Sequence, residues 1–224
     1  MAAYARFPFN GIETLQVNYS QAWQDIFILT MLKGMRNGRY LEIGGHVPVS
    51  NNNTCLLHRQ FGWSGMTLEI DPLHFPLWKW ERPLSRLLIA DALAVDYAQA
   101  LPSWFGEQDK RLDYLQLDID PSINTLGVLK RLPLEDWRFS VITFETDVYT
   151  KDFRARDESR AILSDHGYVL VAKDVSVMFS PVSSQPIPFE DWWVDPQVVD
   201  QQLIDSYQSI NAHTNLPQNL LFSS

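Results

Sequence analysis

The fold of this chain is decided within residues 39–71, which read RYLEIGGHVPVSNNNTCLLHRQFGWSGMTLEID. A short apolar run at 39–45 is followed by helically spaced apolar residues at 53–61 and by a second apolar run at 64–71. Gly44 and Gly45 let the backbone turn sharply where the first run ends. This order predicts a strand, a helix and a second strand parallel to the first.

The same alternation continues along the chain. Further buried strands are expected at 85–91, 112–120, 139–147 and 167–174, and further helices at 73–81, 123–132 and 153–164. A helix capped by Ser20 and running through Leu32 is expected before the first strand. Strands that alternate with helices predict an α/β fold, with a doubly wound, mostly parallel sheet and helices on both faces.

Composition indicates a single globular unit. The 224 residues are 46% hydrophobic, enough to build a core, and no repeat or linker divides them. We expect an N-terminal arm at 1–18, the α/β domain at 19–176, and a segment at 177–224 that packs on the same domain. That segment is expected to hold a C-terminal helix and an aromatic lid in which Trp192 and Trp193 close over a substrate, plug the sheet edge or form a dimer contact.

Charge and cysteine content limit the partners and the compartment. A net charge of −9 disfavours binding to nucleic acid, which depends on neutralising phosphates. The single Cys55 cannot form an intramolecular disulfide, and no apolar run approaches the ~20 residues of a membrane span. The expected location is therefore cytoplasmic, with no membrane span.

Acidic residues follow the predicted strands. Five of the six runs end in Asp or Glu, and these acids are Glu69, Asp71, Asp91, Asp118, Asp120, Glu145, Asp147 and Asp174. The carboxyl ends of parallel strands form the ligand crevice of such sheets, so the acids are expected to meet at one rim. Any single one of them is also explained by capping of the following helix.

The turn at Glu42-Ile-Gly44-Gly45 predicts a particular cofactor polarity. It is not a G-x-G-x-x-G loop, so a pyrophosphate cradle and NAD are disfavoured. Glu42 would repel phosphate and attract an ammonium group, and Glu69 could accept both hydroxyls of a ribose. A cofactor with a nucleoside at one end and a cationic amino acid at the other, S-adenosylmethionine, has that polarity.

The chain resembles the FkbM-like S-adenosylmethionine-dependent methyltransferases. The resemblance begins with SQAWQDIFILTML at 20–32 and YLEIGGHVPVSNNNTCLLHRQFGWSGMTLEIDP at 40–72. Shared features are a Ser-Gln…Gln-Asp helix, a Glu-Ile-Gly turn, an Asn-Thr helix start and a Gly-Trp-x-Gly lead into Glu-x-Asp-Pro. Blocks at 90–93, 112–120, 142–147 and 189–196 extend it to about residues 18–200. It implies a Rossmann-like class I methyltransferase fold.

The resemblance also implies cofactor contacts. It places Glu42 and Gly44 at the methionine end, Glu69 on the ribose, Asp91 and Ala92 beside the adenine, and Asp118 below the sulfonium, with Gln24, Gly45 and Asn53 as further cofactor-binding residues. The chain departs from the family where an Asp-Gly pair is replaced by Val47-Pro48. Proline fixes φ near −65°, so this departure puts cofactor binding in question.

Four residues are candidates for the chemistry: Asp120, Glu145, Asp147 and His46. Methyl transfer needs a positioned nucleophile and a group that removes its proton. The carboxylates could act as a general base or contact the substrate, hold a divalent cation, or be structural, and His46 is either a base or an exposed loop residue. No H-E-x-x-H, C-x-x-C or paired-His spacing is present, so no metal site is predicted; a divalent cation is compatible with the carboxylates but not expected.

The predicted function is methyl transfer from S-adenosylmethionine to a hydroxyl of a small molecule or saccharide. The first alternative is a catalytically inactive binding or partner module that keeps the fold, as Val47-Pro48 would allow. The second is a nicotinamide-dependent oxidoreductase or epimerase, which the absence of a glycine-rich phosphate loop disfavours. The predicted partner is the acceptor molecule, and a homodimer is compatible with the sequence.

Overall fold

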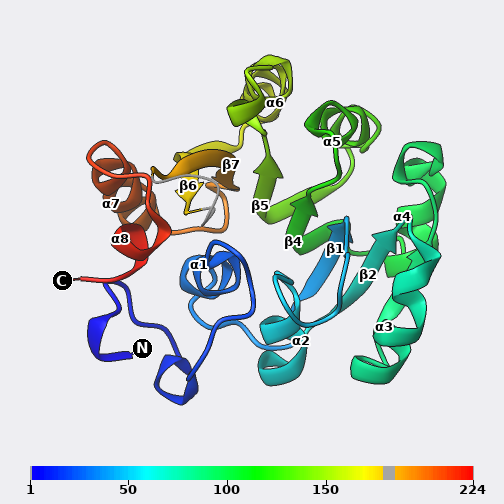
Figure 1. Ribbon diagram of the computed structural model, residues 1–224, viewed down its shortest axis with the longest axis horizontal. Coiled ribbons are helices and arrows are strands. Elements are labelled where there is room, and N and C mark those ends of the chain that lie inside the picture. The colour runs from blue at the N-terminus through cyan, green and yellow to red at the C-terminus, as the bar shows by residue number, and fades with distance from the viewer. Residues whose placement is uncertain (1, 179–184, 224) are drawn as a thin grey trace.

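One seven-stranded sheet forms the centre of the protein. The computed structural model describes residues 2–178 and 185–223. The strand order is β3-β2-β1-β4-β5-β7-β6 (Figure 1). The strands are β1 (Arg39–Ile43), β2 (Ser64–Glu69), β3 (Arg86–Ile89), β4 (Arg111–Leu117), β5 (Arg138–Glu145), β6 (Val169–Val177) and β7 (Ile187–Val194). The first five are parallel, and β7 is antiparallel to both of its neighbours.

Helices cover both faces of this sheet. They are α1 (Gln24–Met31), α2 (Cys55–Phe61), α3 (Phe75–Glu81), α4 (Tyr97–Phe105), α5 (Ser122–Leu129), α6 (Arg154–Asp165), α7 (Gln201–Asn211) and α8 (Pro217–Leu221). One apolar core joins the sheet to α1, α2, α7 and α8, and the other joins it to α4, α5 and α6. Figure 1 shows α5 and α6 on the opposite side of the sheet from α1 and α2. The predicted doubly wound α/β fold is therefore confirmed.

Strand residues supply both cores alternately. On β5, Val141 belongs to the core of α1 and α2, and its neighbour Ile142 belongs to the core of α5 and α6. Successive side chains of a strand point to opposite faces, so a strand covered on both sides reads as a continuous apolar run. This is why the six predicted strands were recognisable as apolar runs.

The aromatic segment is part of the sheet rather than a lid. Residues Ile187–Val194 form β7, which lies between β5 and β6. Trp192 and Trp193 are buried in opposite cores, and the Trp192 ring stacks on Phe27 with 4.3 Å between centroids. The expectation that these tryptophans close over a substrate or meet a second subunit is therefore wrong. The part of the expected lid at 179–184 lies outside the described residues.

The strand was missed because acids interrupt its apolar pattern. Glu190 and Asp191 lie within β7, and both are buried. Gln24 donates a hydrogen bond to Glu190, and Arg160 forms an ion pair with Asp191 at 2.7 Å. Their partners come from α1 and α6, far away in the sequence, so the strand's own residues do not reveal that it is buried.

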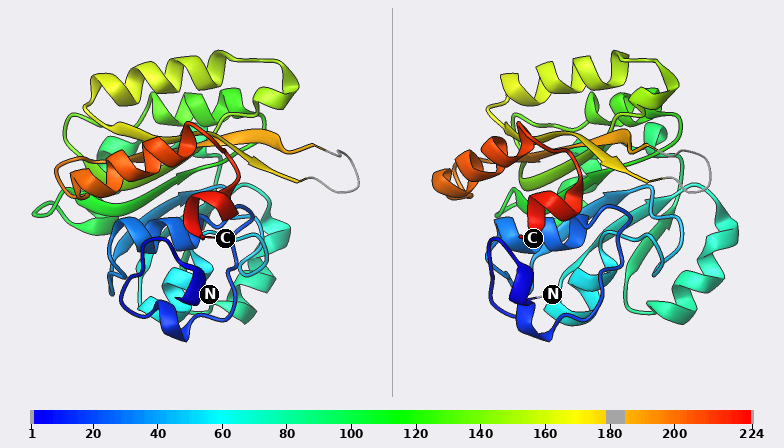
Figure 2. Two further views of the ribbon diagram at one scale, coloured as in Figure 1. Left: turned by 90° about the vertical axis from the view of Figure 1, so that its left-hand side faces the viewer. Right: turned by 60° about the vertical axis from the view of Figure 1, so that its left-hand side comes forward.

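The N-terminal segment is packed against the domain. Phe9, Ile12 and Leu15 are buried in the core of α1 and α2. Ala5 forms an isolated bridge with Phe222, and Figure 2 shows the two ends of the chain close together. In the described part of the chain, no helix combines the length and apolarity that crossing a bilayer requires.

Candidate functional site

A cavity of about 550 Å³ lies at the carboxyl ends of the parallel strands, and is called the strand-end cavity below. Its walls include nine of the residues selected from the sequence: Gly44, Gly45, His46, Glu69, Asp91, Ala92, Asp118, Asp120 and Glu145. Because parallel strands end at the same edge, residues separated by up to 101 positions meet there. Another cavity, of about 560 Å³, lies among the N-terminal segment, α1 and α7, and holds none of the selected residues.

The two glycines of the first turn are required by packing. Gly44 has φ +87°, and a Cβ atom there would lie 1.7 Å from the carbonyl oxygen of Asp118. A Cβ atom on Gly45 would lie 2.2 Å from Cγ2 of Thr67. The glycines therefore permit the close approach of β1 to its neighbours and leave room at the rim of the strand-end cavity.

Glu42 lies behind the cavity wall and not in it. Its Oε1 accepts hydrogen bonds from Asn52 Nδ2 at 3.2 Å and from Thr54 Oγ1 at 3.0 Å, and its Oε2 accepts one from Thr67 Oγ1 at 2.7 Å. Burial raises the pKa of Glu42, and the nearby Arg82 guanidinium opposes that rise. The expectation that Glu42 contacts an ammonium group is not met by this arrangement.

Glu42 holds the side chain of Asn52 in place by accepting its hydrogen bond, and Asn52 lines the cavity. Asn52 Nδ2 also donates to the carbonyl oxygen of Gly45 at 3.2 Å, and Asn52 Oδ1 accepts from Arg82 at 2.9 Å. Glu42 is thus a positioning residue of the first turn. Neither Asn52 nor Arg82 was selected from the sequence, because spacing does not distinguish Asn52 from Asn51 and Asn53, and Arg82 belongs to no motif.

Gln24 and Asn53 are buried and lie outside the cavity lining. Gln24 Nε2 donates to Glu190 Oε2 at 3.2 Å, and Gln24 Oε1 accepts from the Ala22 amide at 2.7 Å. Gln24 therefore joins α1 to β7. Burial raises the pKa of Glu190 to about 8, although hydrogen bonds from Trp192 and Gln24 oppose this.

Glu69 and Asp91 form one side of the strand-end cavity. Glu69 Oε2 accepts the His46 amide at 2.6 Å, and Oε1 accepts the Asp71 amide at 2.8 Å. Each carboxylate oxygen can accept two hydrogen bonds, so each keeps one acceptor position. Asp91 accepts the Leu93 amide at 2.8 Å, which begins the short 3₁₀ turn Ala92–Ala94.

Gln116 is a cavity residue that the sequence analysis missed. Its side chain is 5% exposed, and its Nε2 donates to the carbonyl oxygen of Gly44 at 3.2 Å. Its Oε1 is buried without a hydrogen-bond partner. An unpaired buried amide oxygen costs about 1–3 kcal/mol, so this atom is suited to a donor from a ligand. A lone Gln inside the apolar run at 112–120 was the available signal.

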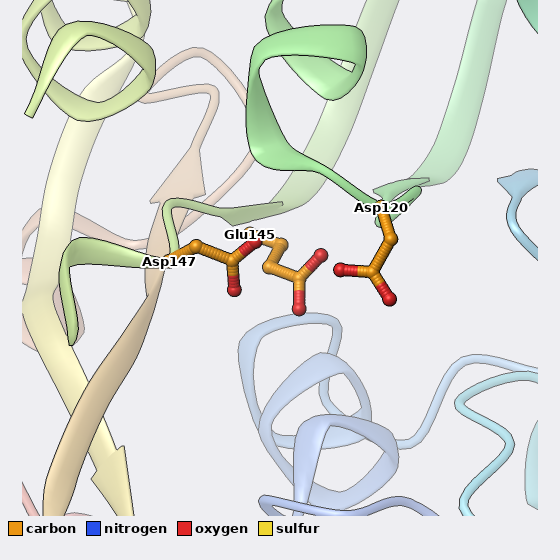
Figure 3. A group of neighbouring side chains, drawn as sticks. All are labelled: Asp120, Glu145 and Asp147. Atoms are coloured by element: carbon orange, nitrogen blue, oxygen red, sulfur yellow. The ribbon is translucent and has the colours of Figure 1, made fainter. Parts of the chain in front are cut away.

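The other side of the cavity carries Asp118, Asp120 and Glu145, which follow or end β4 and β5, and the selected residue Asp147 is outside the lining. Figure 3 shows Asp120, Glu145 and Asp147 with their carboxylates directed toward a common region. One oxygen from each lies within 4.8 Å of the other two. Burial raises the pKa of Glu145, and the negative charge of Asp118 adds to the rise. Burial also raises the pKa values of Asp118 and Asp147.

His46 is exposed on the loop after β1 and lines the cavity. Its ring contacts the His74 ring edge to face, with 4.5 Å between centroids, and its carbonyl oxygen accepts Trp78 Nε1 at 2.8 Å. Val47 and Pro48 lie outside the cavity lining, and the positive φ values of this loop fall on Gly44, His46 and Asn51 instead. The loop therefore accommodates proline without placing it against the cavity.

No family model matches the chain, and no curated protein matches its sequence. Solved structures match the fold. A putative O-methyltransferase from Klebsiella pneumoniae is 20% identical over 81% of this chain and 84% of its own, with a TM-score of 0.53. Cofactor-bound Rv0187 from MTB is 16% identical over 81% of this chain and 83% of its own, with a TM-score of 0.55. The chain therefore has the Rossmann-like fold of class I methyltransferases.

Proposed function

We propose that this protein is an S-adenosylmethionine-dependent methyltransferase acting on a hydroxyl oxygen of a small molecule or saccharide. The observation that carries the proposal is that the strand-end cavity has two sides with different residues. Glu69 and Asp91 form a side suited to a nucleoside, and the carboxylates of β4 and β5 form a side suited to an acceptor. The fold and the resemblance to FkbM-like methyltransferases support it.

The chain's residues fit this cofactor. The remaining acceptor positions of Glu69 suit ribose hydroxyls, and Asp91 with Ala92 would lie beside the base. The buried Gln116 Oε1 would accept an N–H of the ammonium group. Asp118 supplies negative charge between these two regions, which favours a sulfonium. When bound, the cofactor supplies an activated methyl group.

The chain itself would hold the acceptor and take its proton. Asp120 is exposed in the cavity and is the first candidate for the base. Glu145 lines the same wall, where its raised pKa suits it to hold a proton and donate a hydrogen bond to the acceptor. The Asp120 carboxylate can accept the proton of an acceptor hydroxyl that lies within hydrogen-bond distance. His46, on the loop of β1, is the second candidate for this proton. Holding both reactants in one cavity contributes most of the rate increase for an in-line displacement.

Calorimetric titration with S-adenosylhomocysteine tests this function without knowledge of the acceptor. We expect saturable binding to one site, abolished in Glu69→Ala and unchanged in the exposed control Glu107→Ala. Absence of binding in the folded wild-type protein would overturn the proposal. That result would favour the non-catalytic binding module, which predicts the same fold without cofactor affinity.

A further inference from the structure

Asp120, Glu145 and Asp147 form a compact group of carboxylates, called the acid cluster below. Asp120 lies three residues beyond β4, Glu145 ends β5, and Asp147 follows two residues later. One oxygen of each lies within 4.8 Å of the others (Figure 3). Oxygens bound to a single Mg²⁺ or Ca²⁺ at about 2.0–2.6 Å are at most about 4–5 Å apart. The separations are therefore within the range of ligands on one ion.

Two oxygen atoms of the acid cluster are buried without a donor. Asp147 is 2% exposed, and its Oδ1 has no hydrogen-bond partner. The Oε2 atom of Glu145 is also buried without a hydrogen-bond partner. The Asp147 carboxylate interacts with the Tyr149 side chain and the Ser122 amide, but neither interaction occupies Oδ1. Asp71 and Asp91 each accept a backbone amide at the start of a 3₁₀ turn, whereas Asp147 precedes such a turn and makes no side-chain cap bond.

The acid cluster also lacks a cation from the protein. Among residues 2–178 and 185–223, no Lys or Arg forms an ion pair with any of its members. Elsewhere the fold compensates buried carboxylates with arginine: Asp191 pairs with Arg160 at 2.7 Å, and Asp195 pairs with Arg111 at 2.7 Å. Buried carboxylates are paired, neutralised by a raised pKa or bound to metals, so a cation from outside the chain can supply the positive charge that no Lys or Arg of the described residues provides.

We propose that the acid cluster binds one divalent cation, with Asp120, Glu145 and Asp147 as its protein ligands. The ligands are all carboxylate oxygens, without nitrogen or sulfur, which selects hard ions such as Mg²⁺, Mn²⁺ or Ca²⁺ over Zn²⁺. Three protein oxygens leave coordination positions for water or for an oxygen of another molecule.

The position of the acid cluster connects the cation to the acceptor. Asp120 and Glu145 line the strand-end cavity, so the open positions of the ion would face it. The ion would then hold an oxygen of the acceptor hydroxyl in the cavity. This last step rests on the proposed methyltransferase function, whereas binding of the cation does not.

The test measures Mn²⁺ binding directly, by the loss of the electron paramagnetic resonance signal of the aqueous ion during titration of the full chain. We expect one ion per chain and about a hundredfold weaker binding in Asp147→Asn and Glu145→Gln, since even residues that only support metal ligands contribute about 10–100-fold. Asp120→Asn tests the exposed member, whose replacement leaves the core intact. Glu107→Gln removes an exposed charge outside the cavity and should bind Mn²⁺ as the wild type does.

Thermal unfolding provides a second readout for the same variants. Mg²⁺ should raise the unfolding temperature of the wild type, because a ligand that binds only the native state stabilises it, and should leave that of Asp147→Asn unchanged. Lack of saturable binding at millimolar Mn²⁺, or equal binding by the wild type and Asp147→Asn, would overturn the inference. If the protein binds S-adenosylhomocysteine but not Mn²⁺, only this inference is overturned. If it binds Mn²⁺ but not S-adenosylhomocysteine, only the proposed function is overturned.

Discussion

Glu42 and Gln116 lie opposite each other on the neighbouring strands β1 and β4, yet only Gln116 reaches the strand-end cavity. Glu42 is completely buried and its two oxygens are occupied by three side chains. Gln116 retains an oxygen without a partner. The two residues therefore have different roles. Glu42 stabilises the first turn from behind the cavity wall, and Gln116 Oε1 can accept a hydrogen bond from a ligand.

Replacing Glu42 with alanine is expected to affect folding more than ligand contact. The change removes the acceptor of Thr67 Oγ1 and one of the two acceptors of both Asn52 and Thr54, and it takes a carboxyl group away from the buried Arg82 guanidinium. Leaving a buried polar group unpaired costs about 1–3 kcal/mol. Urea unfolding should show a loss of that size, and the exposed Glu107→Ala should show none. A loss equal to that of Glu107→Ala would contradict the positioning role.

Replacing Gln116 with leucine is expected to reduce affinity for S-adenosylhomocysteine about tenfold, since a hydrogen bond to a charged group contributes about 1.5–3 kcal/mol. Calorimetry measures this change. Gln108→Leu, on an exposed loop, is the matched control and should bind normally. Unchanged affinity in Gln116→Leu would show that its unpaired oxygen faces no ligand donor.

Two glycines with positive φ should respond differently to alanine. Gly44 has φ +87° and would place Cβ 1.7 Å from a backbone oxygen, whereas Gly106 has φ +84° and no atom within 4 Å. Gly106, with φ +84° and ψ 167°, lies in a region that is almost restricted to glycine, so Gly106→Ala should cost only this backbone strain, about 1–3 kcal/mol. Gly44→Ala should prevent native folding, as measured by near-ultraviolet circular dichroism. A folded Gly44→Ala protein would show that β1 and β4 can separate at this point.

Trp192→Ala distinguishes a sheet residue from a lid residue. Trp192 is fully buried and stacks on Phe27, so its loss should cost about 3–5 kcal/mol in chemical denaturation. The control is Trp80→Ala, because Trp80 is 82% exposed and surface changes usually stay within about 0.5 kcal/mol. Equal stability of the two variants would be inconsistent with the position of β7.

Glu190 gives the fold a measurable pH dependence. Burial raises its pKa to about 8 in the native state, from a reference of 4.5, so the native protein holds this proton more tightly than the unfolded chain. Its contribution is complete below about pH 4.5 and is lost as pH rises through about 8. Wild-type stability should therefore fall between pH 5 and 8 more steeply than that of Glu190→Gln. Urea unfolding at several pH values within that interval measures both slopes.

A second group, Asp25, shifts stability in the same direction and accounts for the pH dependence that remains in Glu190→Gln. Burial raises the pKa of Asp25 to about 6, so Asp25 also loses its proton with rising pH and remains in both proteins. The Glu190→Gln curve should thus keep part of the slope. Identical slopes in the two proteins would show that Glu190 is not protonated in the native state at neutral pH.

The sequence was most informative where a signal is local. Strands buried on both faces, such as the one containing Val141 and Ile142, read directly as apolar runs, and parallel order then placed Glu69, Asp91, Asp118, Asp120 and Glu145 at one rim. The resemblance did not distinguish residues that line a cavity from residues that support it. Glu42 and Gln24 are supports because partners distant in sequence, Thr67 and Glu190, occupy their polar atoms.

The helix α4 was not predicted from the sequence because Pro102 lies inside it, and proline is unusual in a helix interior. The error at β7 has a non-local cause. β7 has buried acids whose compensation comes from Arg160 and Gln24 on other elements. Gly44 lines the strand-end cavity, and the Asp118 carbonyl oxygen, from another segment, is a further reason for glycine there. None of these partners can be identified from spacing within one segment.

The place of β7 between β5 and β6 has a consequence for biosynthesis. As the chain leaves the ribosome, β5 is complete long before its outer neighbour β7 has been translated, and β6 emerges first but is not hydrogen-bonded to β5. Until residue 194 is available, the nascent chain presents an unpaired strand edge and leaves Phe27 without Trp192. Such an intermediate exposes an apolar strand edge, which favours aggregation until β7 pairs with β5 and β6.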